Sequence, residues 1–284
     1  MASGGVCYRD LETQDDAAGI MRFVDTHAHL THEKFRDDLD AVARRAAEAG
    51  VAAIIVPSSD LDDGAAALAL AERFPQVYAA VGVHPNEAET APPDVMEALS
   101  ALARHSKVVA IGEAGMDHYW EPAKSSPASR ERQRRVFTQQ LELAARLDKP
   151  IIIHQRNCAT ELLEVVAAYR SRVQGVFHCF SESPEIARRV LELGFHISFT
   201  GTLTFKRNDA LRELAATLPA DRVMVETDCP YMSPEPRRDA RRCEPAFVTH
   251  TAAALAAARG VPLEEIARQT TENAMRLFGL TLSA

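Results

Sequence analysis

Residues Pro150–His154 read PIIIH, a short run of β-branched side chains that ends in a histidine. The run follows an amphipathic stretch, Arg132–Leu147, in which apolar residues recur at helical spacing. Apolar runs without polar alternation are typical of parallel strands that are covered on both faces. This part of the chain therefore indicates an α-helix followed by a buried parallel strand.

The same unit, a short apolar run beside an amphipathic stretch, recurs along the chain. Eight such runs are Arg22–Thr26, Ala52–Pro57, Val77–Val83, Val108–Gly112, Pro150–His154, Gly175–His178, His196–Thr200 and Arg222–Thr227. Further amphipathic stretches are Leu39–Ala49, Ser183–Leu193, Asp209–Leu218 and Leu263–Phe278. Strands that alternate with helices are typical of the α/β class, and eight of them in about 260 residues favour a single-domain (β/α)8 TIM barrel. A doubly wound open sheet is the alternative.

Composition excludes several classes of protein. The 284 residues are 46% apolar and 25% charged, which is ordinary globular usage and excludes disordered, collagen-like and coiled-coil chains. The formal net charge of −8 excludes a uniformly basic coat for nucleic acid, although it leaves room for a local basic patch. No apolar run approaches the roughly 18 residues that span a membrane. We therefore expect a protein that does not cross a membrane, with a monomer as the default state.

The start of the chain differs from the rest. Residues 1–20, MASGGVCYRDLETQDDAAGI, have neither strand alternation nor helical periodicity. We expect residues 1–21 to form a loose leader and residues 22–284 to form the barrel. The five cysteines are odd in number, without CxxC spacing or a preceding secretory segment, which predicts reduced thiols and a cytoplasmic location.

Polar residues follow the apolar runs at their carboxyl ends, where the active sites of barrel enzymes lie. The six that carry metal-binding or acid–base chemistry are His27, His29, Glu113, His154, His178 and Asp228. His27 and His29 form an HxH pair, and side chains at i and i+2 of an extended backbone point to the same side. Any one of the six can be a polar residue that merely ends a strand. Together they exceed what one metal ion needs.

We therefore expect two divalent ions. Glu113, on the fourth strand, is the natural bridge between them, with His27, His29 and Asp228 on one ion and His154 and His178 on the other. Imidazole and carboxylate ligands together accept Zn²⁺, Mn²⁺, Co²⁺ or Mg²⁺. Two neighbouring ions serve in-line displacement at phosphorus or attack of water on an amide or ester. Asp228 would orient the water and accept its proton, which makes Asp228 and Glu113 the catalytic candidates.

A covalent mechanism has less support from the sequence. The GxSxG pattern of a nucleophilic serine is absent. Cys179 and Cys229 directly follow His178 and Asp228, so on regular strands they face away from the predicted site.

Groups that bind phosphate or stack on bases are expected around the site if the substrate is a nucleic acid. His84, Arg156, Lys206 and Arg207 are the candidates for phosphate, and Tyr231 is the candidate for stacking on a base. The alternative for each is a solvated loop charge or a packed aromatic ring.

The motifs that contain these residues are VDTHAHL, VGVHP, IGEAGMD, IIIHQR, FHCFS and VETDCPY. In these motifs the chain resembles the TatD family of metal-dependent deoxyribonucleases, over Phe23 to Leu280. The resemblance implies a barrel, two divalent ions on the six residues given above, and 3′-to-5′ exonuclease activity on DNA, with RNA as a second candidate. It also implies a cytosolic location, and we expect single-stranded DNA or 3′ ends as the substrate.

Three departures from the family pattern bear on the substrate. The chain has GEAGMDH where members often have GECGLDY, Cys243 where they often have Asn, and Glu182 where they usually have Gly. None removes a predicted ligand, but a carboxylate at Glu182 would repel phosphate. A metal-dependent amide or ester hydrolase of the aminoacyl-ester or lactone type is therefore the alternative. A binding protein without catalysis is a third reading.

Overall fold

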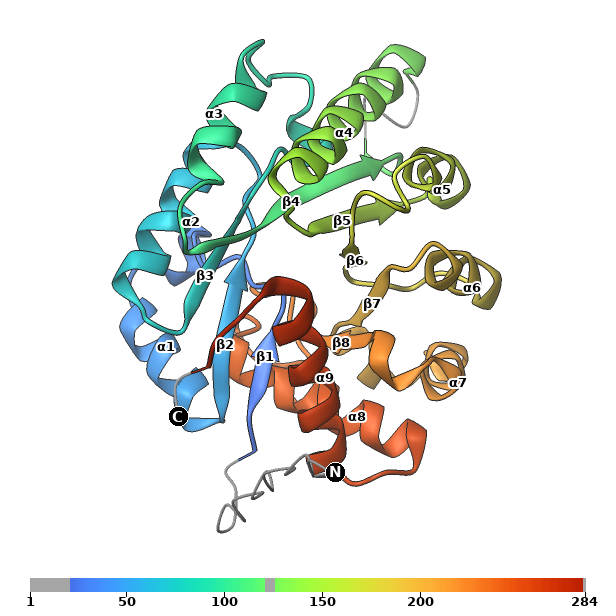
Figure 1. Cartoon of the computed structure of the whole chain (residues 1–284). Helices are drawn as coiled ribbons and strands as arrows, with labels where there is room; N and C mark the ends of the chain where they lie inside the picture. The colour runs from blue at the N-terminus through green and yellow to red at the C-terminus, as the bar shows by residue number, and fades with distance from the viewer. Residues whose placement is uncertain (1–20, 121–125, 283–284) are drawn as a thin grey trace, which may run out of the picture.

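The computed structural model describes residues 21–120 and 126–282, and its centre is a sheet of eight parallel strands (Figure 1). The strands are β1 (Phe23–Asp25), β2 (Val51–Val56), β3 (Val77–Val81), β4 (Val108–Asp117), β5 (Ile151–Arg156), β6 (Gly175–Phe177), β7 (His196–Phe199) and β8 (Val223–Val225). Each strand pairs with the next one along the chain. The amide of Thr26 donates to the carbonyl of Val225 at 3.4 Å, and Ala28 bridges to Cys229, so the chain just beyond β1 meets the end of β8.

The fold is therefore a (β/α)8 TIM barrel, as expected. The strand order excludes the doubly wound sheet, because that fold places its first strand in the interior of the sheet rather than beside the last.

Helices follow the strands and surround the barrel (Figure 1). They are α1 (Leu39–Glu48), α2 (Leu61–Arg73), α3 (Val95–Leu102), α4 (Pro127–Leu147), α5 (Ala159–Ala167), α6 (Pro184–Glu192), α7 (Asp209–Thr217), α8 (Val248–Arg259) and α9 (Leu263–Phe278). Short 3-10 helices lie at Glu33–Phe35, Pro85–Glu87, Gly201–Thr204, Ala220–Arg222 and Pro245–Phe247. The helix predicted at Leu263–Phe278 is confirmed, and it ends where Gly279 adopts the left-handed conformation that favours glycine.

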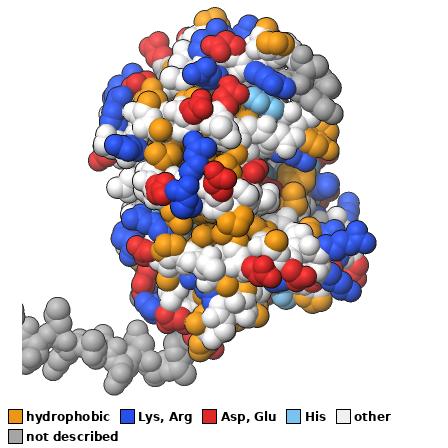
Figure 2. Space-filling model, turned by 90° about the vertical axis from the view of Figure 1, so that its right-hand side faces the viewer, with side chains coloured by type: hydrophobic (Ala, Val, Ile, Leu, Met, Phe, Trp, Pro, Cys, Tyr) orange, Lys and Arg blue, Asp and Glu red, His pale blue; other side chains and the backbone are white. Residues whose placement is uncertain are grey.

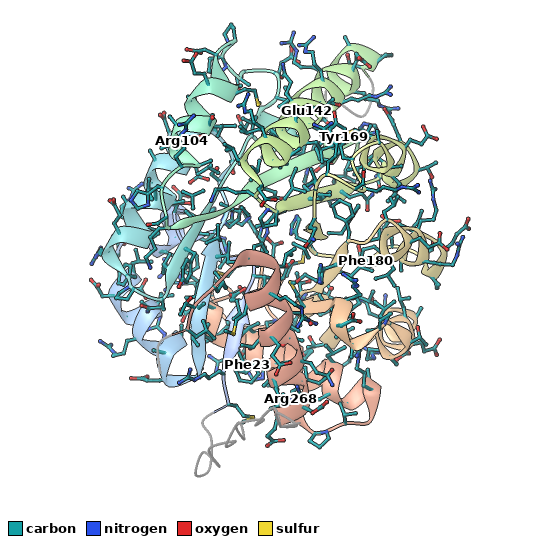
Figure 3. The ribbon with its side chains drawn as sticks, in the orientation of Figure 1. Phe23, Arg104, Glu142, Tyr169, Phe180 and Arg268 are labelled. Carbon is teal, nitrogen blue, oxygen red and sulfur yellow. The ribbon has the colours of Figure 1, made fainter. Side chains whose placement is uncertain are left out.

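Two apolar clusters fill the molecule. The larger lies between the strands and the outer helices, where Phe23 and Phe180 are buried (Figure 3). The smaller takes side chains from the strands and from α9. Thr271 and Asn273 of α9 donate side-chain hydrogen bonds to the carbonyls of Arg22 and Val223, so α9 covers the amino end of the barrel. The opposite, carboxyl end is left for the polar residues.

The predicted end of the fourth strand at Gly112 is wrong. β4 continues to Asp117 and pairs with β5 as far as Arg156, with one extra residue on β4 between Ile111 and Ala114. Glycine and acidic residues have low strand propensity, so the sequence signal stops where the hydrogen bonds of β5 still hold β4 extended. The leader predicted for residues 1–21 lies outside the described residues, apart from the exposed Met21.

The surface carries charges of both signs. On the face over α5, α6 and α7, acidic and basic side chains alternate around apolar groups, without one basic region (Figure 2). Some charges are paired: Arg172 forms an ion pair with Glu142 at 2.8 Å, and Tyr169 donates a hydrogen bond to the same carboxylate, where the segment after α5 meets α4 (Figure 3). The cysteines among the described residues form no disulfide with one another. None of the described helices is both long and apolar enough to cross a membrane.

Candidate active site

A cavity of about 630 Å³ opens at the carboxyl end of the barrel. Five of the six predicted ligands line it, namely His29, Glu113, His154, His178 and Asp228. The sixth, His27, is fully buried beneath them. The structure thus brings together residues that are up to 201 positions apart in the chain, since the parallel strands all end at this face.

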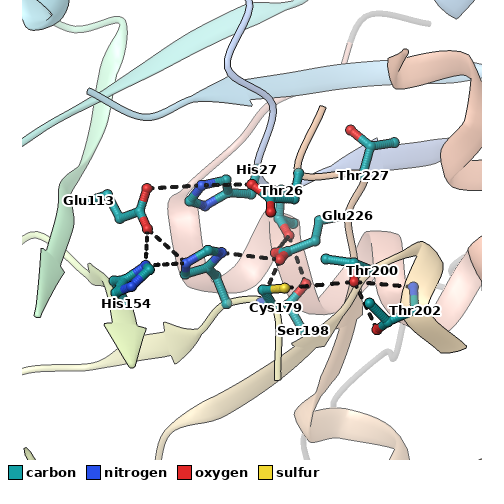
Figure 4. A network of polar contacts seen from close by, with 12 residues as sticks. Thr26, His27, Glu113, His154, Cys179, Ser198, Thr200, Thr202, Glu226 and Thr227 are labelled. Atoms are coloured by element: carbon teal, nitrogen blue, oxygen red, sulfur yellow. Dashed lines mark hydrogen bonds and ion pairs between the residues drawn. The ribbon is translucent and has the colours of Figure 1, made fainter. Parts of the chain in front are cut away.

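Glu113 contacts histidines through both of its carboxylate oxygens, and Figure 4 shows it joined to His27 and His154. One carboxylate oxygen, Oε2, lies 3.2 Å from Nε2 of His27 and 3.6 Å from Nε2 of His29. The other oxygen, Oε1, lies 2.6 Å from Nδ1 of His154 and 2.8 Å from Nε2 of His178. Each oxygen of this one carboxylate therefore faces a different pair of histidines.

The local backbone explains how Glu113 reaches this position. The extra residue of β4 lies in the segment that contains Glu113, and such a bulge redirects the side chains beside it. Two residues later, a side chain at Gly115 would collide with the carbonyl oxygen of His154. Glycine at this position lets β4 approach β5 closely enough for Glu113 to contact His154.

The histidines of each pair also face each other. Nε2 of His27 lies 3.2 Å from Nε2 of His29, and Nδ1 of His154 lies 3.2 Å from Nε2 of His178. Oδ1 of Asp228 adds to the first pair, at 3.5 Å from Nε2 of His29. Ring nitrogens that converge on one another and on a carboxylate oxygen form a donor set that suits a cation. The residues present therefore fit metal binding: His27, His29 and Glu113 form one group that could hold an ion, and His84, Glu113 and His154 form another.

The buried charges shift one another's pKa values. Burial alone would raise the pKa of Glu113, but its electrostatic interactions with His178, His27 and His84 lower it well below its usual value. Burial alone would lower the pKa of His178, but Glu113 and Glu226 raise it well above its usual value. In the same way, burial alone would raise the pKa of Asp228, but the hydrogen bond from His29 together with the electrostatic effects of His27 and His178 lowers it. The two carboxylates are thus ionised and available as ligands at neutral pH.

Two carboxylates behind the cluster were not predicted as site residues. Oδ2 of Asp117 lies 3.1 Å from Nε2 of His154, and Oε1 of Glu226 lies 3.4 Å from Nδ1 of His178. Glu226 also accepts a hydrogen bond from the amide of Cys179 at 2.6 Å (Figure 4). A carboxylate on the far nitrogen of a histidine fixes the ring orientation and the tautomer. The spacing of Glu226, two residues before Asp228, was the available signal.

The predicted substrate residues divide into two groups. His84, Arg156 and Tyr231 line the same cavity as Glu113, and Nε2 of His84 lies 3.6 Å from Oε1 of Glu113. Arg207 lines a second cavity together with Glu182, and Lys206 lines neither of the two. The structure therefore does not bring Lys206 and Arg207 to the described lining of the Glu113 cavity, and their role stays a prediction.

The thiols next to the cluster are poor nucleophiles. Sγ of Cys179 contacts Oγ1 of Thr200 at 3.7 Å, and neither Cys179 nor Cys229 is among the described residues that line the Glu113 cavity. Burial, with the charges of Asp228 and Glu226, raises the pKa of the Cys179 thiol well above its usual value. A protonated buried thiol is unreactive, which agrees with a mechanism that uses no cysteine.

Comparison with known proteins identifies the family. Residues 24–279 match the family described as TatD related DNase. The chain belongs to the TatD family. It is 38% identical to "Uncharacterized metal-dependent hydrolase YabD" of Bacillus subtilis over 89% of this chain and 98% of that protein. It is 35% identical to "3'-5' ssDNA/RNA exonuclease TatD" of Citrobacter rodentium over 92% of this chain and 99% of that protein.

A solved structure of the same family has the same fold. The TatD homolog YjjV of Escherichia coli superposes with a TM-score of 0.86 at 35% identity, over 93% of this chain and the whole of that chain. This TatD-family protein is therefore a metal-dependent hydrolase built on a TIM barrel. Relatives of similar identity carry exonuclease names or only the general hydrolase name.

Proposed function

We propose that this TatD-family protein is a two-metal nuclease that removes nucleotides from the 3′ end of single-stranded DNA, with RNA as a second substrate. One observation carries the proposal: two pairs of histidine nitrogens, each 3.2 Å apart, lie on the two oxygens of one carboxylate, Glu113. The exonuclease name of the Citrobacter rodentium relative supports the direction and the substrate.

The residues would divide between the two ions as follows. His27, His29 and Asp228 would hold one ion, His154 and His178 would hold the other, and Glu113 would bridge them. When bound, Mg²⁺, Mn²⁺, Zn²⁺ or Co²⁺ would stabilise negative charge on the phosphate and lower the pKa of the attacking water. Asp228, held ionised, would accept the proton of that water.

The charges of the cavity support ions as part of the site. The described lining includes Asp60, Asp63 and Glu87 besides the acidic residues of the cluster, but Arg156 is its only arginine or lysine. A phosphodiester anion would be repelled by this set of carboxylates, so bound cations are needed before such a substrate enters. His84 and Arg156 would then contact the phosphate from the rim.

The test is digestion of 3′-labelled and 5′-labelled single-stranded DNA after chelation and after return of each metal. We expect metal-dependent release of 3′ mononucleotides by the wild-type protein and none by His154→Ala. The matched control is His105→Ala, because His105 contacts Glu72 outside the cavity. Equal cleavage by wild type and His154→Ala would overturn the proposal.

The same experiment separates the alternative substrates. Inertness toward DNA and RNA, with metal demonstrably bound, would point to the amide or ester hydrolase, and hydrolysis of aminoacyl esters or lactones would then be measured. The monomeric state and the cytoplasmic location stay predictions from the sequence.

A further inference from the structure

Exposed large apolar side chains gather at the mouth of the Glu113 cavity. In the part of the chain that the structure describes, five such side chains are exposed, and four of them are Tyr119, Trp120, Tyr231 and Met232. Trp120, Tyr231 and Met232 line the cavity, and the ring of Tyr119 packs edge-on against Trp120 at 4.7 Å between centroids. Apolar groups concentrated at one opening mark a surface that binds a ligand with flat apolar parts.

The aromatic groups lie on two sides of the mouth. Tyr119 and Trp120 follow β4, whereas Tyr231 and Met232 follow β8, four strands away in a barrel of eight. Strands separated by half the barrel are opposite each other. Tyr231 is also close to the ligand cluster, with its ring centroid 6.2 Å from that of His29. A flat group that enters the cavity therefore passes between Trp120 and Tyr231.

Arg156 adds a positive charge to the same rim. Its guanidinium stacks 3.7 Å from the ring centroid of Tyr119 and lies 5.4 Å from that of Trp120. Within residues 21–120 and 126–282 it forms no ion pair, and it lines the cavity beside His154. Stacking on an aromatic ring orients a guanidinium while its N–H groups stay available for a phosphate.

We propose that Trp120 and Tyr231 form a base-binding rim that stacks an unpaired nucleobase of the strand, while Arg156 holds a backbone phosphate. This inference rests on the proposed nuclease function, which identifies the bound strand as nucleic acid. Aromatic faces stack on any base, so the rim selects unpaired bases rather than a sequence. A base inside a duplex is already stacked and paired, and its faces are closed to Trp120.

Binding at Trp120 can be followed by tryptophan fluorescence, because Trp120 is the single tryptophan of the 284 residues. Tryptophan fluorescence is measured while Mg²⁺-loaded protein is titrated with oligothymidylate whose phosphorothioate linkages resist cleavage. The matched control strand has the same linkages with abasic sugars in place of the bases. We expect saturable quenching by the strand with bases, and at least about five-fold weaker binding of the abasic strand and of a blunt duplex.

Kinetics give a second readout. Trp120→Ala is expected to raise the KM for single-stranded DNA about five-fold or more with a smaller change in kcat, and Trp120→Phe is expected to restore KM. Met21→Ala, the fifth exposed apolar residue, is the control outside the rim. Equal quenching by the strands with and without bases, or an unchanged KM in Trp120→Ala, would overturn the proposal of a base-binding rim.

Failure of the rim and failure of the nuclease are distinguishable. Base-dependent quenching without cleavage of unmodified DNA would keep the rim and reject the nuclease. Cleavage with quenching that ignores the bases would keep the nuclease and reject the rim.

Discussion

Two buried histidines near neighbouring strands have pKa values that are shifted in opposite directions. His178 follows β6 at the carboxyl end of the barrel, and His196 begins β7 at the amino end. Their exposed fractions are nearly equal, 7% and 6%. The pKa of His178 is raised well above its usual value, because Glu113 and Glu226 outweigh burial. The pKa of His196 is lowered to about 4 by burial, with the charge of Arg222 adding to the effect.

The comparison separates the effect of burial on the pKa of a histidine from the effect of neighbouring charged groups. Burial by itself disfavours the charged imidazole, and only neighbouring carboxylates reverse that effect. The same carboxylates make the carboxyl end attractive to a divalent cation, whereas Arg222 and Arg276 near His196 repel one. A buried histidine is therefore a candidate ligand when its nitrogens face carboxylates, and otherwise it is a packed core residue.

The largest expected effect comes from removing the carboxylate that both histidine pairs share. Glu113→Gln keeps the shape but loses the charge beside His27, His29, His154 and His178. We expect loss of bound metal, two ions under the proposed function, and a fall in activity greater than the roughly 10- to 100-fold typical of residues behind a ligand. Metal content by mass spectrometry and circular dichroism would check this. Full metal content in a folded variant would contradict the central role of Glu113.

A smaller effect is expected from the carboxylates behind the second pair of histidines. Glu226→Gln and Asp117→Asn each remove a charge that orients His178 or His154. We expect each to weaken metal binding about 10- to 100-fold, measured by titration calorimetry. Glu142→Gln is the matched control, because Glu142 pairs with Arg172 on the surface. An unchanged metal affinity in both variants would show that histidine orientation does not depend on these carboxylates.

At the amino end of the barrel, protonation of His196 is expected to change the free energy of unfolding rather than metal binding. Because the pKa of His196 is about 4 when folded and about 6.5 when unfolded, the unfolded chain binds more protons between these pH values. Stability from this group is therefore present above about pH 6.5 and decreases as the pH falls toward 4. We expect roughly 2 kcal/mol less free energy of unfolding at pH 5 than at pH 7 from this source.

The variant His196→Gln tests this dependence, because it removes the titrating group. Urea unfolding at pH 5 and pH 7 should give a smaller difference in the variant than in the wild type, with metal binding unaffected. An equal pH dependence in both proteins would assign the acid sensitivity to other groups.

The sequence predicted those parts of the fold and site that depend on short-range patterns. The apolar composition of runs such as PIIIH predicts buried strands. Helical periodicity predicted the helix at Leu263–Phe278 with its correct bounds. The HxH pair at His27 and His29 was visible because extended backbone sends i and i+2 to one side. The remaining predicted ligands stood out because they lie at the carboxyl ends of apolar runs, and their roles in metal binding stay proposals.

Tertiary structure decided what depends on distant parts of the chain. The pairing of β4 with β5 extended β4 to Asp117, where composition alone ended it at Gly112. Closure of the barrel placed Asp117 beside His154 and Glu226 beside His178, and it brought Trp120 and Tyr231 to the lining of one cavity. It also left Lys206 and Arg207 outside the described lining of that cavity. Composition and periodicity act over a few residues, whereas side-chain convergence depends on how all eight strands twist and close.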